Sequence, residues 1–316
     1  MSKSTGAFYG IDVSKDSLSI GMWGDPPVVE DLPNTAKAIR SWLKRIAPSS
    51  SIGMESTNTY HLLVARLAHE AGHRVHVLQP RAVNSYAKSL QVRGKTDQMD
   101  AVVIARMVAK EGPELRVWEP PTPLQDLLRR LSNARGGLVK MRSSAKLMAQ
   151  SYKEFEAVFE EIEKALENGI ETLQQTMNEH IKEDRQMSGF NKRVQGVAGV
   201  GPVVGTLLSS LFHTYPLTSP DAAVAYIGFD PRPRESGKWQ GQRRISKNGP
   251  SEARRCLFLA GRAAMNSKAW ASYVAVQERK GLSPTQIAII MARKIIKIAW
   301  YMWRRPEMNF DPGRIQ

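Results

Sequence analysis

Four acidic residues are the strongest candidates for chemistry in this sequence. Asp12 lies in the apolar run FYGIDVSK, and Glu55 ends a second apolar run in SIGMEST. Asp97 and Asp100 lie three residues apart in RGKTDQMDA, where a helix is expected to begin, so both side chains should leave one face of that helix. Two Mg²⁺ ions need several oxygen ligands close together, and such a pair can hold both oxygens of a phosphoryl transfer. The four acids therefore favour phosphodiester chemistry.

Each acid also has an ordinary explanation. An Asp after a strand often forms a turn, and an Asp at a helix start often serves as a cap or a dipole partner. Together, however, one acid on a first strand, one on a later strand and two on a helix resemble the metal-binding set of a ribonuclease-H-like nuclease core. An actin-like sugar-kinase fold also opens with a Gly-Ile-Asp strand, but it needs glycine-rich phosphate loops, and none is convincing in this sequence.

The composition indicates a polyanionic partner. The 316 residues include 45 Lys and Arg against 30 Asp and Glu, a formal net charge of +15, and nucleic acid is the simplest partner for such a chain. A membrane is disfavoured, because the start MSKSTGAF lacks an apolar signal core and the apolar stretch near 285–303 contains Arg293, Lys294 and Lys297. Cys256 is the single cysteine, which excludes an intramolecular disulfide and fits the cytoplasm.

Residues 1–118 show the alternation of an α/β domain with helices packed on a mixed sheet. A break follows in GPELRVWEPPTPLQ, which contains four prolines. The expected elements, in order, are strands in FYGIDVS and LSIGMWG, a helix in TAKAIRSWLKRIA, a strand in SIGME, a helix in HLLVARLAHEA, a strand in RVHVLQ and a helix in DQMDAVVIARMVAKEG.

Residues 119–187 are predicted to be helical. Apolar residues recur in steps of three and four, which is one stripe of a long helix, and glutamates crowd its flanks. The stripe comprises Ile162, Leu166, Ile170, Leu173, Met177 and Ile181. A helical hairpin that spaces two domains and a coiled-coil dimer seam explain this stripe equally well, because an apolar stripe needs only some partner.

Residues 188–316 open with RVQGVAGVGPVVGTLLSSLF, whose Gly199-Val200-Gly201 turn resembles a helix–hairpin–helix. Glycines in such a turn let backbone N–H groups approach a phosphate closely. The alternative is an ordinary tight connection between two helices. Near the four acids, Lys15 and Lys95 can steer a phosphate, although plain surface lysines are the alternative.

A basic loop follows in GFDPRPRESGKWQGQRRISKNG, with Ser236 and Gly237 in its middle. Glycine and proline keep its start out of regular structure, and its cations suit a nucleic-acid backbone. The candidate nucleic-acid contacts are Arg232, Arg234, Lys238, Arg243, Arg244 and Lys247, extended by Arg254 and Arg255 on the helix after it.

The whole chain resembles the DEDD transposases of bacterial insertion sequences, which are RNA-guided (bridge-RNA) recombinases. GIDVSK, the ME at 54–55 and RGKTDxxDA carry the resemblance in the first domain. GVAGVGP, GFDPRxxxSG and ISKNG carry it in the last domain. The implied fold is α/β plus α: a ribonuclease-H-like (RuvC-like) mixed-sheet domain over 1–118, a helical coiled-coil linker over 119–187, and a mainly helical C-terminal transposase domain over 188–316.

The resemblance implies a composite active site. Asp12, Glu55, Asp97 and Asp100 would bind Mg²⁺, as two ions, and Ser236 would attack the DNA phosphodiester. It also implies a homo-oligomer, dimer or tetramer, a guide RNA that pairs with donor and target double-stranded DNA, and a location in the bacterial cytoplasm with the nucleoid.

Serine chemistry separates three hypotheses. A covalent phosphoserine stores the broken bond, so that strands can be exchanged and rejoined without ATP. The acids alone would activate water, as in a metal-dependent, junction-resolving RuvC-like nuclease, and Ser236 would then only contact phosphate. A non-catalytic nucleic-acid-binding protein with a relic nuclease fold is the third hypothesis, and the intact acidic set argues against it.

Overall fold

The computed structural model describes residues 6–56, 59–90, 96–232, 235–236, 239–241 and 244–314, without the side chains of 235–236, 239–240 and 314. The chain divides into two compact units, residues 1–120 and residues 121–316. Each unit has its own buried apolar cluster.

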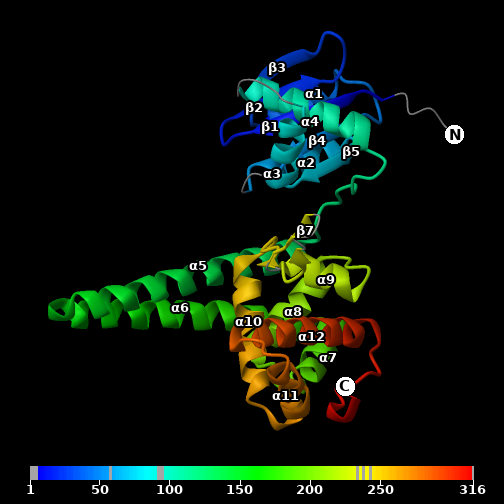
Figure 1. Cartoon of the computed structure of the whole chain (residues 1–316). Coiled ribbons are helices and arrows are strands. Elements are labelled where there is room, and N and C mark those ends of the chain that lie inside the picture. Colours follow the sequence, from blue (N-terminus) through cyan, green and yellow to red (C-terminus); the bar gives the residue numbers. More distant parts are fainter. Residues whose placement is uncertain are drawn as a thin grey trace. The chain divides into compact units, whose positions relative to one another are not determined.

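The first unit is a mixed five-stranded sheet between helices (Figure 1). The strand order is β3-β2-β1-β4-β5, with β1, β2 and β3 antiparallel and β1, β4 and β5 parallel. Its elements are β1 Phe8–Val13, β2 Ser17–Met22, β3 Val28–Pro33, α1 Ala36–Leu43, β4 Ser51–Glu55, α2 His61–Glu70, β5 Arg74–Leu78, α3 Pro80–Ser89 and α4 Asp97–Glu111.

The predicted α/β character of this unit and its mixed sheet are confirmed, and two elements were not predicted. The edge strand β3 has alternating exposed residues and the sequence VVEDLP, whose acids and proline hide its strand character. Helix α3 begins at Pro80 with no side-chain cap and has a low apolar content, so its sequence carries a weak helix signal.

The two faces of the sheet are packed in different ways. On one face, large apolar side chains such as Ile11, Ile52 and Met54 pack with Trp42 of α1 and Val64 of α2, all at most 1% exposed. On the other face, glycines take the place of these side chains, and α4 lies directly against the backbone of the strands. The residues of this glycine row are Gly21, Gly10 and Gly53, which are neighbours in the strand register.

The glycine row is what lets α4 approach the sheet closely. A β-carbon at Gly10 would overlap the carbonyl oxygen of Ala101 and the amide nitrogen of Ala105. A β-carbon at Gly21 would lie 2.7 Å from the amide nitrogen of Val102. Because backbone atoms cannot move aside as a side chain can, any larger residue here would push α4 off the sheet.

Helices build the second unit, whose short strands belong to the basic loop. Its elements are α5 Pro123–Ser151, α6 Glu156–Glu183, α7 Arg185–Val194, α8 Pro202–Thr214, α9 Pro220–Ile227, β6 Pro231–Arg232, β7 Glu235–Ser236, β8 Trp239–Gln240, β9 Arg244–Ile245, α10 Ser251–Met265, α11 Ala271–Arg279 and α12 Pro284–Arg304, with 3₁₀ turns at Lys153–Phe155, Lys268–Trp270 and Pro312–Arg314.

Helix α12 supplies the centre of this unit. Ile287, Met291, Ile295 and Ile296 are at most 1% exposed and belong to one cluster with residues of α7 to α11. Burial against neighbouring helices explains why this stretch of the sequence is so apolar. Among the described residues, no helix is long and apolar enough to cross a membrane.

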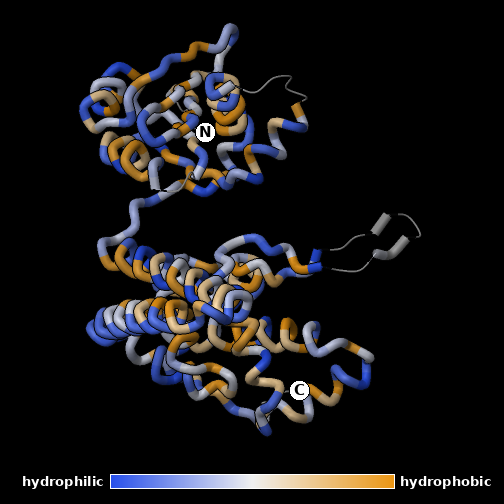
Figure 2. Tube along the Cα trace, turned by 90° about the vertical axis from the view of Figure 1, so that its left-hand side faces the viewer, coloured by the Kyte–Doolittle hydropathy of each residue, from blue (hydrophilic) through white to orange (hydrophobic). Residues whose placement is uncertain are grey.

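Helices α5 and α6 form a long antiparallel hairpin (Figure 1). The predicted apolar stripe lies on α6 and becomes more buried along the helix, from Ile162 at 43% exposed through Ile170 at 8% to Ile181 at 0%. Figure 2, which looks toward the tip of the hairpin, shows both hydrophilic and hydrophobic residues in it. At its buried end the stripe therefore packs within its own chain, and its exposed end lies near the tip of the hairpin.

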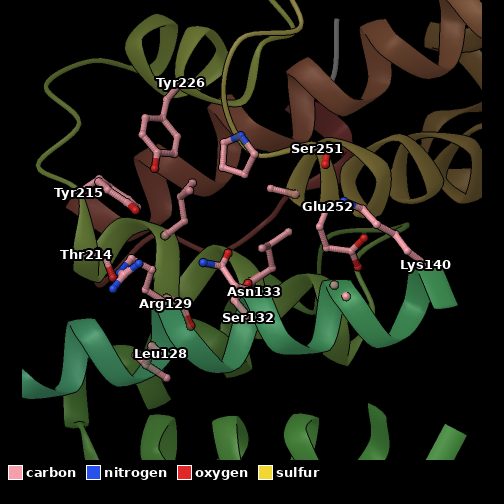
Figure 3. Close-up of a pocket in the computed structure, with 17 residues that line it drawn as sticks. Leu128, Arg129, Ser132, Asn133, Lys140, Thr214, Tyr215, Tyr226, Ser251 and Glu252 are labelled. Atoms are coloured by element: carbon pink, nitrogen blue, oxygen red, sulfur yellow. The ribbon is translucent and has the colours of Figure 1, made fainter. Parts of the chain in front are cut away.

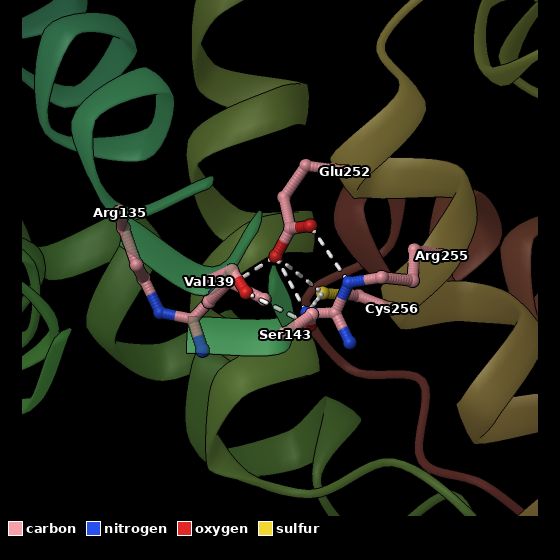
Figure 4. Close-up of polar contacts among 6 residues, drawn as sticks. All are labelled: Arg135, Val139, Ser143, Glu252, Arg255 and Cys256. Carbon is pink, nitrogen blue, oxygen red and sulfur yellow. Dashed lines mark hydrogen bonds and ion pairs between the residues drawn. The ribbon is translucent and has the colours of Figure 1, made fainter. Parts of the chain in front are cut away.

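A cluster of charged side chains joins α5 to α10 (Figure 4). The Glu252 carboxylate accepts a hydrogen bond from Arg135 of α5 at 3.1 Å and two from Arg255, at 2.7 and 2.8 Å. Burial raises the pKa of Glu252, but the hydrogen bonds and charges of its partners outweigh burial and lower it overall. Cys256 lies beside this carboxylate, and burial raises the pKa of its thiol to about 11, which disfavours the nucleophilic thiolate.

The glycine row yields a stability prediction. Gly10→Ala should destabilise the first unit by about 2–3 kcal/mol, because its methyl group would overlap the backbone of α4. Native-state hydrogen exchange of the β1 amides measures this loss. Gly24→Ala is the matched control, since its nearest neighbour would be 3.5 Å away and its effect should stay below about 0.5 kcal/mol. Equal protection in the two variants would contradict this account of the packing.

Candidate functional site

Asp12 and Glu55 lie side by side at one edge of the sheet. In the parallel pair of β1 and β4, Ile11 is opposite Met54, so the next residues along the two strands are Asp12 and Glu55. Both belong to the face that carries Gly10 and Gly53, because residues two apart on a strand share a face. Two carboxylates therefore end neighbouring parallel strands on the side covered by α4.

Helix α4 begins at this same edge. Its middle residues Ala101 and Ala105 lie over Gly10, and its later residues Ile104 and Val108 pack with Phe8 at the start of β1. The helix therefore runs opposite to β1, and its first turn lies toward the end of that strand. Thr96 caps the helix by accepting a hydrogen bond from the Met99 amide at 3.2 Å.

Asp97 and Asp100 occupy that first turn, as expected from the sequence. Asp97 is exposed and Asp100 is half-buried. Asp97 is four and seven residues before the buried Ala101 and Ile104, so it belongs to the helix face that meets the sheet. Negative side chains at a helix N-terminus interact favourably with the helix dipole, which makes this turn suitable for two acids.

A further acid, Asp31 of β3, joins this edge and was not predicted from the sequence. In the strand register Asp31 is opposite Ser19, and Ser19 is opposite Asp12. The Asp31 carboxylate accepts hydrogen bonds from the Ser19 hydroxyl at 2.6 Å and from the side chain of Gln98 at 2.9 Å. It thus ties the first turn of α4 to the sheet. The sequence VVEDLP has no apolar–polar alternation, so no local signal marked this strand or its Asp31.

These acids offer oxygen ligands of the kind that Mg²⁺ prefers. Asp12 and Glu55 are neighbours and would be the first ligands of such an ion, while Asp97 and Asp100 come from the helix at the same edge. The four are not drawn into one tight cluster: in the described part of the chain, no group of three or more His, Cys, Asp or Glu is close enough to hold a metal ion. The residue types fit a magnesium site, and the backbone brings two of them together.

Four further nucleic-acid contacts were predicted, two lysines near the acids and two glycines in the turn between α7 and α8. Lys15 is exposed in the turn after β1, and Lys95 lies outside the described residues. Gly199 has a φ of +97°, and a β-carbon there would lie 2.6 Å from the carbonyl oxygen of Ala260, so packing against α10 explains this glycine. Gly201 is the N-cap residue of α8, and a β-carbon there would have nothing within 4 Å, which suits a close approach of a phosphate.

The basic loop leaves α9 and returns to α10 as a narrow ribbon. Strand β6 pairs with β9, which places Arg232 opposite Arg244, both exposed. Arg234, Lys238 and Arg243 lie outside the described residues. Ser236 belongs to β7, which pairs with β8, and its side chain lies outside the described part of the structure.

Two glycines fix the base of this ribbon. Gly228 and Gly249 both have a φ of +84°, which favours glycine, and a β-carbon at either would overlap backbone atoms, of Asn248 and of Tyr226 respectively. The Lys247 amide donates to the Gly228 carbonyl at 3.1 Å, and Ser246 donates to the Asp230 carboxylate. The ribbon therefore projects from a rigid crossing of the chain.

The two arginines on α10 have structural partners. The Arg254 guanidinium donates to the carbonyl oxygens of Ile227, Asn248 and Gly249 at 3.0 to 3.4 Å, and so helps to hold the crossing closed. Arg255 is paired with Glu252. The half of Arg255 that stays exposed can still contribute charge to a bound polyanion.

Family comparisons agree with this combination of an acidic sheet edge and a basic helical unit. A family model described as a transposase matches residues 9–152, and a second, described as the transposase IS116/IS110/IS902 family, matches residues 191–275. Both describe enzymes that rearrange DNA, and they cover both units. The chain belongs to the IS116/IS110/IS902 family of transposases, which confirms the resemblance drawn from the sequence.

Two curated relatives are similar over most of their length. The pilin gene-inverting protein of Moraxella bovis is 26% identical over 260 residues, which are 80% of this chain and 79% of the relative. The pilin gene-inverting protein of Moraxella lacunata is 26% identical over 268 residues, 79% of this chain and 82% of the relative. The family implies DNA substrates and suggests a divalent metal.

The contact between Asp31 and Ser19 yields a prediction about pH. Hydrogen bonds from Ser19, first, and from Gln98 lower the pKa of Asp31 below its usual 3.8. The stabilisation is therefore fully present above pH 3.8 and is lost as the pH falls through the lower pKa of the folded state. Ser19→Ala should raise the pKa of Asp31, measured by NMR titration, whereas the control Ser17→Ala should leave it unchanged. An unchanged pKa in Ser19→Ala would show that this bond is absent in solution.

Proposed function

We propose that this protein is an RNA-guided DNA recombinase of an insertion sequence, which cuts and exchanges strands through a covalent phosphoserine at Ser236. One observation carries the catalytic part: Asp12 and Glu55 are neighbours at the sheet edge where α4 begins with Asp97 and Asp100. Membership of a transposase family and the basic ribbon that bears Ser236 support the rest.

The proposed step balances without a further reactant. The Ser236 hydroxyl oxygen forms a bond to phosphorus, the bond from phosphorus to a 3′- or 5′-oxygen breaks, and the serine proton passes to the leaving oxygen directly or through a neighbouring base. Magnesium bound at the acids would offset the charge on the phosphate. The carboxylates that would hold the magnesium are those of Asp12, Glu55, Asp97 and Asp100. The reverse of the same step joins the new strand end.

Substitution of the serine and of one acid tests this chemistry. The gene is expressed together with its native flanking DNA in the presence of Mg²⁺, the protein is denatured and digested, and mass spectrometry searches for a nucleotide on the peptide that contains Ser236. We expect an adduct that disappears in Ser236→Ala and falls at least about a hundredfold in Asp97→Asn, the usual scale for loss of a group that acts in the transition state. Ser272→Ala and Asp16→Asn are exposed controls and should keep it.

The hydrolytic nuclease gives the opposite result. Cut DNA with no adduct, and with full cutting in Ser236→Ala, would sink the phosphoserine proposal and reduce Ser236 to a phosphate contact. Strand exchange that persists after RNase treatment of the purified protein would sink the RNA-guided part alone.

We further propose that the tip of the α5–α6 hairpin joins copies of this chain. Large apolar side chains are concentrated there and exposed, although such residues are usually covered. They are Met141 at 60%, Leu147 at 64%, Met148 at 47%, Tyr152 at 50%, Phe155 at 58%, Val158 at 57% and Ile162 at 43% exposed. A second copy offers the same self-complementary surface, as in a symmetric dimer.

Charges placed at the tip should separate the copies. The double variant Leu147→Glu, Phe155→Glu should lower the molar mass measured by light scattering by a factor of two or more, because a charge at an apolar interface loses its hydration. Leu259→Glu, at an apolar position 47% exposed on α10, is the matched control and should leave the mass unchanged. A mass unaffected by the tip variant would overturn this interface.

A further inference from the structure

The second unit contains a cavity of about 410 Å³ (Figure 3). Helices α5, α8, α9 and α10 enclose it. Its wall is partly apolar, with polar side chains that include Arg129, Asn133, Lys140, Tyr215, Tyr226 and Ser251. An apolar cavity with a few convergent polar groups is the usual form of a small-ligand site.

One end of the cavity suits an anion. Helix α10 begins here, and Ser251, Glu252 and Ala253, its first three residues, line the wall. The cap residue Pro250 makes no side-chain hydrogen bond to these amides. The first amides of a 15-residue helix attract a phosphate through their N–H groups and the helix dipole.

A buried hydroxyl provides an independent sign of a ligand. Ser210 of α8 lines the cavity, is 8% exposed, and its hydroxyl has no hydrogen-bond partner among the described residues. Buried polar groups are nearly always paired, so a hydroxyl left without a partner at a cavity wall is suited to a polar ligand.

The negative charge of Glu252 does not exclude an anion. Arg135 and Arg255 both bind its carboxylate, so these three groups together carry one positive charge. Lys140 on the wall adds another, and Arg129 is paired with Asp126 at 2.6 Å. The local field therefore favours a negatively charged group at the α10 end.

The other end of the cavity suits a flat ring. The rings of Tyr215 and Tyr226 are 4.5 Å apart at 38°. In Figure 3 both hydroxyls point toward the interior, on the same side as the Asn133 amide. Aromatic faces and such polar atoms are what hold a nucleobase in single-strand binding proteins.

The cavity also lies at the foot of the basic ribbon. Tyr226 is one residue from the end of α9, where the ribbon leaves, and Pro250 directly precedes α10, where the ribbon returns. A strand held by the exposed Arg232 and Arg244 would pass this opening. The positive charge at the α10 end, the two tyrosine rings and the position beside the ribbon all favour the same kind of ligand, a nucleotide.

We propose that this cavity binds one nucleotide of a single nucleic-acid strand, with its phosphate at the start of α10 and its base against Tyr215 and Tyr226. The proposal rests on the nucleic-acid substrates of the family and is independent of the serine chemistry and of RNA guidance. DNA and RNA strands share this chemistry, so both are tested.

Filling the cavity tests the proposal without weakening the fold. Gly137 lines the cavity on α5 with nothing within 4 Å of its β-carbon position, so Gly137→Leu should enter the space and also favour the helix. Ala134→Leu, at an exposed position of α5 that does not line the cavity, is the matched control. The probes are a DNA and an RNA oligonucleotide of the same sequence with 5-iodouracil, which cross-links to nearby aromatic side chains on irradiation.

In the wild-type full chain we expect a cross-link to the peptide containing Tyr215 or the one containing Tyr226, with DNA, RNA or both. Gly137→Leu should reduce the cross-link and the affinity by about tenfold, the scale of one stacked base, at an unchanged or higher melting temperature. Lys140→Gln should also weaken binding, compared with Lys146→Gln on the exposed hairpin. Ser236→Ala should keep the cross-link.

The opposite result is equally clear. Equal cross-linking and affinity in Gly137→Leu and Ala134→Leu would overturn the nucleotide site. If the wild-type protein formed no phosphoserine adduct but kept this cross-link, the serine chemistry would be overturned and the cavity proposal would stand.

Discussion

The close packing of α4 on the backbone of the sheet is the constraint on which the acidic edge depends. Because Gly21, Gly10 and Gly53 have no side chains, the helix lies against three strands at once. Its direction is opposite to that of β1, so its N-terminal turn meets the end of the strand that carries Asp12. A larger residue at Gly10 or Gly21 would meet the backbone of α4, lift the helix and separate its acids from those of the sheet.

In the second unit, backbone contacts fix the base from which the cationic ribbon extends. The crossing at Gly228 and Gly249 brings the ends of α9 and α10 together, and Arg254 bridges them through carbonyl oxygens. Tyr226 and Pro250, which adjoin this crossing, line the cavity between α5 and α10. Repulsion among the cations of the ribbon would otherwise spread such a loop, so its base must be fixed by backbone contacts.

Charge is distributed unevenly along the chain. The flanks of α6 are rich in glutamate, whereas the ribbon and the start of α10 carry arginine and lysine. The glutamates make α6 a poor partner for phosphates, whereas α5 of the same hairpin carries several arginines and lysines. The Glu252 cluster connects the two regions, because it links α5 of the hairpin to α10 at the end of the ribbon.

The sequence by itself determined the mixed α/β class, the long helices, the family and the candidate acids, because these depend on local periodicity and on short motifs. It did not predict β3, α3 or Asp31, since an edge strand with acids lacks a local signal. Only the tertiary structure decided that Asp12 and Glu55 are neighbours, that Gly199 serves packing, and that Arg254 and Arg255 have structural partners. These facts depend on strand register and helix crossings, which join residues far apart in the chain and leave no trace in any short segment of it.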